Sequence, residues 1–280
     1  MKRLCVIGDP IEHSKSPLIQ NAMIRAAGLD YVYEARQVAG SDTAQWLVQA
    51  KRERYAGFNA TMPHKQTLVK LVDELSPDAA RIGAVNTVCL REGRAYGFNT
   101  DGEGVLRALL EADMDPSGKT VLVLGAGGAA KAVVCSLLKA GAQKVAVANR
   151  TVKHAGDLCA QLGMPGAMAC DFSRETLCRH AAQSDLVVNC TSLGMTGTAG
   201  QFDDLSFLSE LKAGAGVFDL IYSPARTLLL TEAERLGHPV ANGLGMLIWQ
   251  AVFALEHFTQ TELDGPAMAA AARQVLEAEV

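Results

Sequence analysis

Residues 120–150 read TVLVLGAGGAAKAVVCSLLKAGAQKVAVANR. The run from Thr120 to Leu124 is apolar, as expected for a strand that is buried on both faces of a sheet. A helix is expected from the glycine-rich turn to Ala140, where Gly141 ends it, and Lys144–Ala148 is expected as the next strand. This order predicts a βαβ unit that begins in the middle of the chain.

The turn between this strand and helix fits the pattern G-x-G-x-x-A at Gly125, Gly127 and Ala130. The first glycine allows a tight turn, the second lets the backbone approach a pyrophosphate, and the small third residue lets helix and strand pack closely. Free N–H groups and the helix dipole favour an anion there. We therefore predict a dinucleotide site, with a ligand-free glycine turn as the alternative. Its expected contacts are Gly125, Ala126, Gly127, Gly128 and Ala129.

The end of the second strand indicates which dinucleotide is bound. NAD sites usually place an acidic residue there for the ribose 2′-hydroxyl, whereas NADP sites favour Arg, which pairs with the 2′-phosphate. Here the strand runs into Asn149, Arg150 and Thr151, with Lys153 and His154 beyond, and the first carboxylate is Asp157. This pattern predicts NADP, and the alternative is that Arg150 is only a solvated cation.

Composition places limits on the class of protein. With 280 residues, of which 49% are hydrophobic and 20% charged, the chain can form one large or two medium folded domains. A net charge of −4 provides no broad basic surface for nucleic acid. No apolar run approaches the roughly 18 residues of a membrane span, and the N-terminal apolar stretch is too short for a signal peptide. We expect a cytoplasmic protein.

The seven cysteines contain no CxxC pair, and the six histidines show no ligand spacing such as HExxH. Most of the cysteines have apolar neighbours, so we predict reduced thiols that behave as small hydrophobic residues, and no metal site.

Strand-like and helical patterns alternate along the rest of the chain, which is typical of an α/β fold. Strands are expected at Leu4–Ile7, Gly57–Thr61, Leu186–Asn189 and Val217–Leu220. Helices are expected at Pro17–Ala27 with Ser16 as N-cap, Lys65–Glu74, Gly102–Ala112, Gly245–Phe258 and Pro266–Glu279.

A nucleotide domain in mid-chain implies a separate N-terminal domain. We predict an N-terminal α/β substrate domain formed by residues 1–101 plus 244–280, with the C-terminal helices packing back on it. Residues 102–243 are predicted to form a Rossmann-like, doubly wound parallel sheet that binds NADP. The active site is then expected between the two domains.

Three polar clusters in the first hundred residues have no obvious structural purpose. Ser14 and Ser16 precede a helix, where hydroxyls and N–H groups suit a carboxylate. Asn59 and Thr61 share one face of a strand, and Lys65 follows at a helix start. The segments GAVNT (83–87) and GFNTDG (97–102) place amides and hydroxyls at strand ends. Taken alone, Asp101 would most simply cap the helix that follows it, and Lys65 would be an ordinary surface lysine.

These residues resemble the shikimate dehydrogenases, whose close relatives are the quinate/shikimate dehydrogenases. The resemblance covers almost the whole chain. Its motifs are HSKSP (13–17), NATMPHK (59–65), AVNT (84–87), NTD (99–101), GAGGA (125–129), NRT (149–151), NCTS (189–192), DLIYSP (219–224) and GLGM (243–246) with Gln250. The resemblance implies the NADP-dependent reversible reduction of 3-dehydroshikimate to shikimate, a step in chorismate and aromatic amino acid biosynthesis.

The resemblance also implies roles for individual residues. Lys65 and Asp101 would form the catalytic pair. The substrate would be bound by Ser14 and Ser16 at its carboxylate, and by Asn59, Thr61, Asn86, Tyr222 and Gln250 elsewhere. Thr191, Leu220 and Gly243 would complete the cofactor site.

Gln20 and Trp249 depart from the usual biosynthetic pattern toward the quinate/shikimate branch, while Ala60 replaces the usual Val. His154 stands where a second basic residue often holds the 2′-phosphate, with Lys153 as a substitute. A quinate/shikimate dehydrogenase using NAD or NADP therefore stays open. A non-enzymatic NADP sensor is the third hypothesis, and the presence of both Lys65 and Asp101 argues against it. The oligomeric state stays open, with a homodimer as one option.

Overall fold

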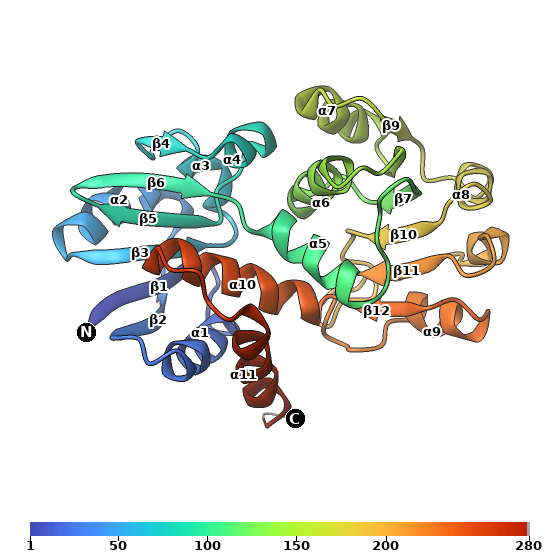
Figure 1. The fold of residues 1–280 in the computed structure, drawn as a ribbon. Helices are drawn as coiled ribbons and strands as arrows, with labels where there is room; N and C mark the ends of the chain where they lie inside the picture. Colours follow the sequence, from blue (N-terminus) through green and yellow to red (C-terminus); the bar gives the residue numbers. More distant parts are fainter. Residues whose placement is uncertain (279–280) are drawn as a thin grey trace. The chain divides into compact units, whose positions relative to one another are not determined.

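Each half of the computed structural model, which describes residues 1–278, has its own six-stranded sheet (Figure 1). The first unit comprises Met1–Gly104 and the residues from Ile248 on, and the second comprises Val105–Leu247. These boundaries lie a few residues beyond the expected ones, because α5 (Asp101–Glu111) and α10 (Leu244–Thr259) are continuous helices that run from one unit into the other.

The sheet of the first unit is mixed. Its strand order is β2-β1-β3-β5-β6-β4; β1 is parallel to β2 and β3, β4 is parallel to β6, and β5 is antiparallel to both of its neighbours. The strands are β1 (Lys2–Gly8), β2 (Tyr31–Gln37), β3 (Tyr55–Ala60), β4 (Glu74–Leu75), β5 (Thr87–Arg91) and β6 (Arg94–Phe98). The helices are α1 (Ser16–Ala26), η1 (Gly40–Asp42), α2 (Thr43–Arg52), α3 (Lys65–Leu68), α4 (Pro77–Ile82) and α11 (Gly265–Glu277), together with parts of α5 and α10.

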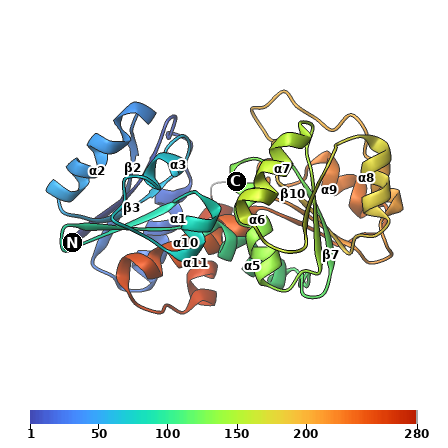
Figure 2. The same cartoon turned by 90° about the horizontal axis from the view of Figure 1, so that it is seen from above.

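Helices cover both faces of this sheet. On one face, alternate residues of β1 and β3 such as Ile7 and Phe58 pack with Trp46 of α2 in a buried apolar cluster. On the other face lie α1, α10 and α11 (Figure 2), and the ring of Phe258 in α10 lies directly against Gly57. The C-terminal helices therefore complete the first unit, as predicted.

The second sheet is fully parallel, with the strand order β12-β11-β10-β7-β8-β9. Its strands are β7 (Thr120–Leu124), β8 (Lys144–Ala148), β9 (Ala167–Cys170), β10 (Leu186–Asn189), β11 (Gly216–Asp219) and β12 (Val240–Asn242). Helices α6 (Gly128–Lys139) and α7 (Val152–Leu162) cover one face, and α8 (Arg174–Ala181) and α9 (Leu228–Arg235) the other (Figure 2), while η2 is Ser206–Glu210. This is the predicted doubly wound fold, and its topological switch point lies between β7 and β10.

Two local predictions were wrong. The helix expected at Lys65–Glu74 ends at Leu68, because the Asp73 carboxylate accepts hydrogen bonds from Ala95 N and Lys51 Nζ and draws the following residues into β4. Ser16 is not an N-cap, since α1 begins at Ser16 itself and the N–H of Ser16 donates to Ser14 Oγ. The last predicted helix corresponds to α11, and its expected end at Glu279 lies outside the described residues.

Within residues 1–278, no helix is long and apolar enough to cross a bilayer, and no group of three His, Cys, Asp or Glu side chains is placed to hold a metal ion. All seven cysteines are free, and burial raises the pKa of Cys170 to about 11.

The close approach of α10 to β3 generates a stability prediction. A methyl group on Gly57 would lie 2.6 Å from both Val88 O and a ring carbon of Phe258, and the β5 backbone cannot easily yield. We expect Gly57→Ala to lower the free energy of unfolding by about 1–3 kcal/mol, the usual cost of overpacking. The urea midpoint, followed by circular dichroism, measures the change.

Gly156→Ala is the matched control, because nothing lies within 4 Å of its added methyl group in α7. Alanine is the better helix former, so this variant should be equally or more stable. A Gly57→Ala protein with an unshifted midpoint would contradict the tight packing of α10 on β3.

Candidate active site and dinucleotide site

Four segments of the first unit end or begin at one edge of its sheet. β1 and β3 are parallel neighbours, so Gly8 and Ala60 leave the sheet on the same side. β5 runs the opposite way between β3 and β6, and its first residue, Thr87, pairs with both Asn59 and Phe98. The segments carrying Ser14, Lys65, Asn86 and Asp101 are therefore all attached to this edge.

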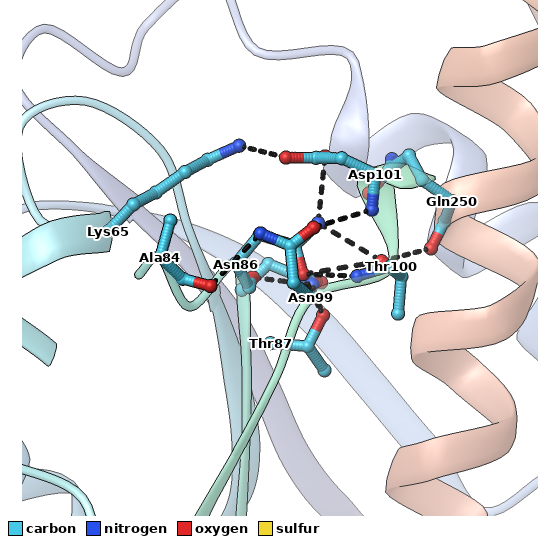
Figure 3. Close-up of polar contacts among 9 residues, drawn as sticks. Lys65, Ala84, Asn86, Thr87, Asn99, Thr100, Asp101 and Gln250 are labelled. Carbon is cyan, nitrogen blue, oxygen red and sulfur yellow. Dashed lines mark hydrogen bonds and ion pairs between the residues drawn. The ribbon is translucent and has the colours of Figure 1, made fainter. Parts of the chain in front are cut away.

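Lys65 and Asp101 meet here although they lie 36 positions apart in the sequence (Figure 3). Lys65 Nζ donates to Asp101 Oδ2 across 2.6 Å. The carboxylate side chain is 11% exposed, whereas the lysine side chain remains 30% exposed. The ammonium is thus held by a largely buried carboxylate yet remains accessible to a ligand, an arrangement that suits proton transfer.

Asn86 holds the other side of this carboxylate. Its Nδ2 donates to Asp101 Oδ1 at 2.8 Å and to Thr100 Oγ1 at 3.0 Å, while its Oδ1 accepts from Thr100 N at 2.9 Å (Figure 3). Asn99 Oδ1 also accepts from Asp101 N. Both carboxylate oxygens of Asp101 are therefore engaged by side chains, which goes beyond the simple capping role that its position alone suggests.

The side-chain amide of Asn59 forms hydrogen bonds within the protein. Its Nδ2 donates to Asn86 O and Thr87 Oγ1, and its Oδ1 accepts from Tyr33 OH at 2.6 Å. Burial raises the pKa of Tyr33 well above its usual value, so the phenol keeps the proton that it donates. Asn59 therefore fixes the start of β5 through its hydrogen bonds to Asn86 and Thr87, and its contact with substrate stays a prediction.

Ser14 and Thr61 are half-buried in loops at the same edge, and Ser16 is half-buried at the start of α1. Thr61 N donates to Ile7 O, and a methyl group on Gly8 would lie 2.5 Å from the Thr61 methyl carbon. The two loops are therefore packed closely together.

Gln250 is placed beside this cluster by α10, since Thr100 Oγ1 donates to the Gln250 carbonyl at 3.0 Å (Figure 3). Tyr222 belongs to the second unit, in the segment after β11, and is 40% exposed.

The glycine turn of the second unit has the geometry of an anion cradle. Gly125 has a φ of +99°, and a methyl group there would lie 2.9 Å from the Thr191 side chain. Added methyl groups on Gly127 and Gly128 would instead meet nothing within 4 Å. Gly127 is the N-cap of α6 and supplies no side-chain cap, so the open N-terminus of a 12-residue helix suits a phosphate.

Asn149 joins this turn to the end of β8, because its Oδ1 accepts from Ala126 N while its Nδ2 donates to Thr151 O. Lys153 pairs with Asp157 on the exposed face of α7, and His154 N donates to Thr151 O.

Arg150 is exposed and lines a cavity of about 290 Å³. Phe172 and Phe202 lie on the same cavity with their rings stacked 6.3 Å apart. Sequence patterns did not indicate these two aromatic residues, which come from loops far apart in the chain.

Thr191, Leu220 and Gly243 follow β10, β11 and β12 at the same edge of the second sheet. The backbones of Leu220 and Gly243 approach so closely that a methyl group on Gly243 would lie 1.9 Å from Leu220 O. Only glycine fits this position without rearrangement.

No role was predicted from the sequence for three residues that form hydrogen bonds around the site of the first unit: Tyr33, Asn99 and Thr100. Asn99 and Thr100 lie within a motif noted in the sequence, whereas Tyr33 does not.

Comparison with known proteins gives consistent matches. Residues 6–88 match the family model described as the shikimate dehydrogenase substrate binding domain, and residues 108–196 match that described as shikimate / quinate 5-dehydrogenase. A relative from Geobacter metallireducens, named shikimate dehydrogenase (NADP(+)), is 42% identical over 266 residues, which cover 92% of this chain and 91% of the relative.

Two solved structures extend the similarity to the whole fold. One is shikimate 5-dehydrogenase from Thermus thermophilus in complex with NADP(H) and shikimate, with a TM-score of 0.86, 35% identity, and coverage of 98% of this chain and 100% of the other. The second is the enzyme from Listeria monocytogenes with shikimate and NAD, with a TM-score of 0.89, 32% identity, and 96% of each chain covered. The chain therefore belongs to the shikimate dehydrogenase family.

Proposed function

We propose that this protein is an NADP-dependent oxidoreductase that reversibly reduces 3-dehydroshikimate to shikimate, as in chorismate and aromatic amino acid biosynthesis. Membership of the family supports the reaction. The observation that carries the proposal is the accessible Lys65 ammonium, held at 2.6 Å by the largely buried carboxylate of Asp101. A dinucleotide-binding scaffold alone would not need such a pair.

The residues of the second unit fit NADP. The open glycine turn at the start of α6 would hold the pyrophosphate, and Arg150 would pair with the 2′-phosphate. Ala126, Ala129, Asn149, Thr151, Lys153, His154, Thr191, Leu220 and Gly243 are proposed to complete the site. NADPH, when bound, supplies the hydride for the ketone carbon.

Lys65 is proposed as the general acid in the reductive direction. Its Nζ holds three protons, one of which can pass to the substrate oxygen as that oxygen becomes a hydroxyl. Asp101 orients the ammonium and can accept a hydrogen bond from a substrate hydroxyl.

Ser14 and Ser16 are proposed to bind the substrate carboxylate, since hydroxyl groups at the start of α1 are suitable donors. Asn59, Thr61, Asn86, Tyr222 and Gln250 are proposed to contact the rest of the substrate. In the described structure the polar atoms of Asn59 and Asn86 already have partners, so we assign both a supporting role as well.

Replacing Lys65 tests the catalytic assignment. We expect Lys65→Ala to lower kcat by about 10²-fold or more, the usual scale for loss of an acid/base group. NADPH binding should be retained, because the proposed cofactor residues lie in the other unit. Steady-state rates and a fluorescence titration with NADPH measure the two effects.

Lys51→Ala is the matched control. Lys51 pairs with Asp73 at 2.9 Å and, like Lys65, has a side chain that is 30% exposed. Its loss removes an ordinary ion pair worth about 1 kcal/mol at most, and kcat should not change. Wild-type turnover by Lys65→Ala would remove this lysine from the mechanism.

Initial rates with shikimate and quinate, each with NADP and NAD, test the function itself. We expect kcat/KM to be highest for shikimate with NADP, and about tenfold or more above the value with NAD, because a charge-assisted contact to the 2′-phosphate is lost with NAD. Absence of turnover with every pair would refute the proposal.

The second candidate is a quinate/shikimate dehydrogenase with dual cofactor use. It is favoured by His154 at a position where the family often has a second basic residue, and by the pairing of Lys153 with Asp157. The Listeria relative was solved with NAD. Comparable kcat/KM for both acids, or for both cofactors, would support this candidate and contradict the preference stated above.

Arg150 is the cation on which the cofactor preference should depend. We expect Arg150→Ala to raise KM for NADPH by about tenfold while that for NADH changes little, since only NADPH carries the 2′-phosphate. Arg174→Ala is the control, because Arg174 lines the same cavity but is tied to Asp204 and Ser206. Equal changes in both KM values for Arg150→Ala would contradict the assignment.

We also propose a cytoplasmic location, in keeping with a soluble metabolic substrate. Sedimentation of the purified protein distinguishes a monomer from a homodimer.

A further inference from the structure

Asp219 is a buried carboxylate that the mechanism above does not use. It ends β11 in the second unit, and its side chain has no exposed surface. Burial raises its pKa above the usual range, although hydrogen bonds from Thr227, Ile221 and Asn189 oppose this shift. A buried carboxylate lowers stability unless its partners compensate. Asp219 lies at the edge of the second sheet where the proposed cofactor residues Thr191 and Leu220 follow their strands, so its location calls for a functional explanation.

Three donors from different segments converge on this carboxylate. Asn189 Nδ2, at the end of β10, donates to Oδ1 at 2.9 Å, and Ile221 N donates to the same oxygen at 3.1 Å. Thr227 Oγ1 donates to Oδ2 at 2.7 Å and itself caps α9 by accepting from Leu230 N. Asp219 thus joins the ends of two neighbouring strands to the start of a helix.

The bond to Asn189 reaches the glycine turn. Because Oδ1 of Asp219 receives the amide NH₂ of Asn189, the amide oxygen must face the other way. That oxygen accepts from Thr191 N at 3.0 Å and from Thr191 Oγ1 at 2.7 Å. The Thr191 side chain in turn lies against Gly125. The orientation of one amide therefore links the carboxylate to the phosphate-binding turn.

The bond to Ile221 fixes a second segment. Ile221 O accepts from Gly243 N, and Leu220 O lies in close contact with Gly243. The Leu220 segment is therefore clamped between Asp219 on one side and Gly243 on the other. Both segments held by Asp219 carry residues proposed to contact the cofactor.

We propose that Asp219 is a positioning residue for NADP, which acts through Asn189 on the Thr191 segment and through the Ile221 N–H on the Leu220 segment. This inference rests on the proposed function, because it assumes that both segments contact the cofactor. It assigns Asp219 no contact with the cofactor and no part in proton transfer.

Two substitutions of Asp219 separate positioning from charge. Asp219→Ala removes the acceptor of all three donors, and we expect the Kd for NADPH to rise by about tenfold or more. In Asp219→Asn, the amide oxygen can still accept from Asn189 and Ile221 while the NH₂ group faces Thr227 Oγ1. The Kd of this variant should stay within about threefold of the wild-type value. Fluorescence titration with NADPH measures both.

Asp185→Ala is the matched control for a merely structural role. Asp185 lies at the other end of β10, accepts from Thr120 N and Lys212 Nζ, and so also joins separate segments of the same sheet. Its loss should lower the urea midpoint and leave the Kd for NADPH unchanged.

Binding by the wild-type protein tests the proposed function, and the variants test the inference. A wild-type Kd in Asp219→Ala, or an Asp219→Asn protein as weak as Asp219→Ala, would overturn it. If Asp219→Ala does not fold, Asn189→Ala removes the amide that connects Asp219 to Thr191. A raised Kd in that variant would support the inference, and an unchanged one would overturn it.

Discussion

The hydrogen bonds of the Asn86 side chain hold the polar cluster of the first unit together. The NH₂ group bonds to Asp101 and Thr100, and the oxygen accepts from the backbone of Thr100, so the start of α5 is fixed to the start of β5. Asp101 can then present its second oxygen to Lys65. Loss of the Asn86 amide would remove the hydrogen bond to Asp101 Oδ1 and the acceptor of Thr100 N, so the carboxylate that holds Lys65 would be less firmly oriented.

The antiparallel hairpin of β5 and β6 explains how these residues meet. In a fully parallel sheet, one edge receives only the ends of strands, as at the cofactor edge of the second unit. Insertion of β5 in the opposite direction brings a strand start to the same edge as the ends of β3 and β6. Asn86 can therefore form hydrogen bonds both with Asn59, which precedes it in the sequence, and with Thr100 and Asp101, which follow it.

The sequence predicts the second unit more accurately than the first. Thr120–Leu124, Lys144–Ala148 and Leu186–Asn189 were predicted with their observed ends, because strands buried on both faces form uninterrupted apolar runs. In the first unit, Lys65–Glu74 has a local helical pattern, yet its last residues join the sheet through bonds to the distant Ala95 and Lys51. Local propensity cannot register such contacts.

The candidate site likewise contains features that the sequence predicts and features that it does not. The motifs indicated Lys65 and Asp101, since their residue types fit proton transfer and matched a known family. They did not reveal that Asn59 faces Tyr33 and Thr87, because a polar residue in a strand can face a ligand or a neighbouring side chain with equal ease. The link from Asp219 to the Thr191 segment depends on the orientation of one amide, which no sequence pattern specifies.

The path of the chain also constrains how the protein can be made. Residues 105–247 lie between the two parts of the first unit, so a ribosome releases the second unit before most of α10 and all of α11 emerge. Until then, the β3 surface around Gly57 lacks Phe258, and α1 lacks its neighbour α11 (Figure 1). Until α10 and α11 are made, only α1 covers this face of the N-terminal sheet, and the apolar surface left open is exposed to aggregation during synthesis.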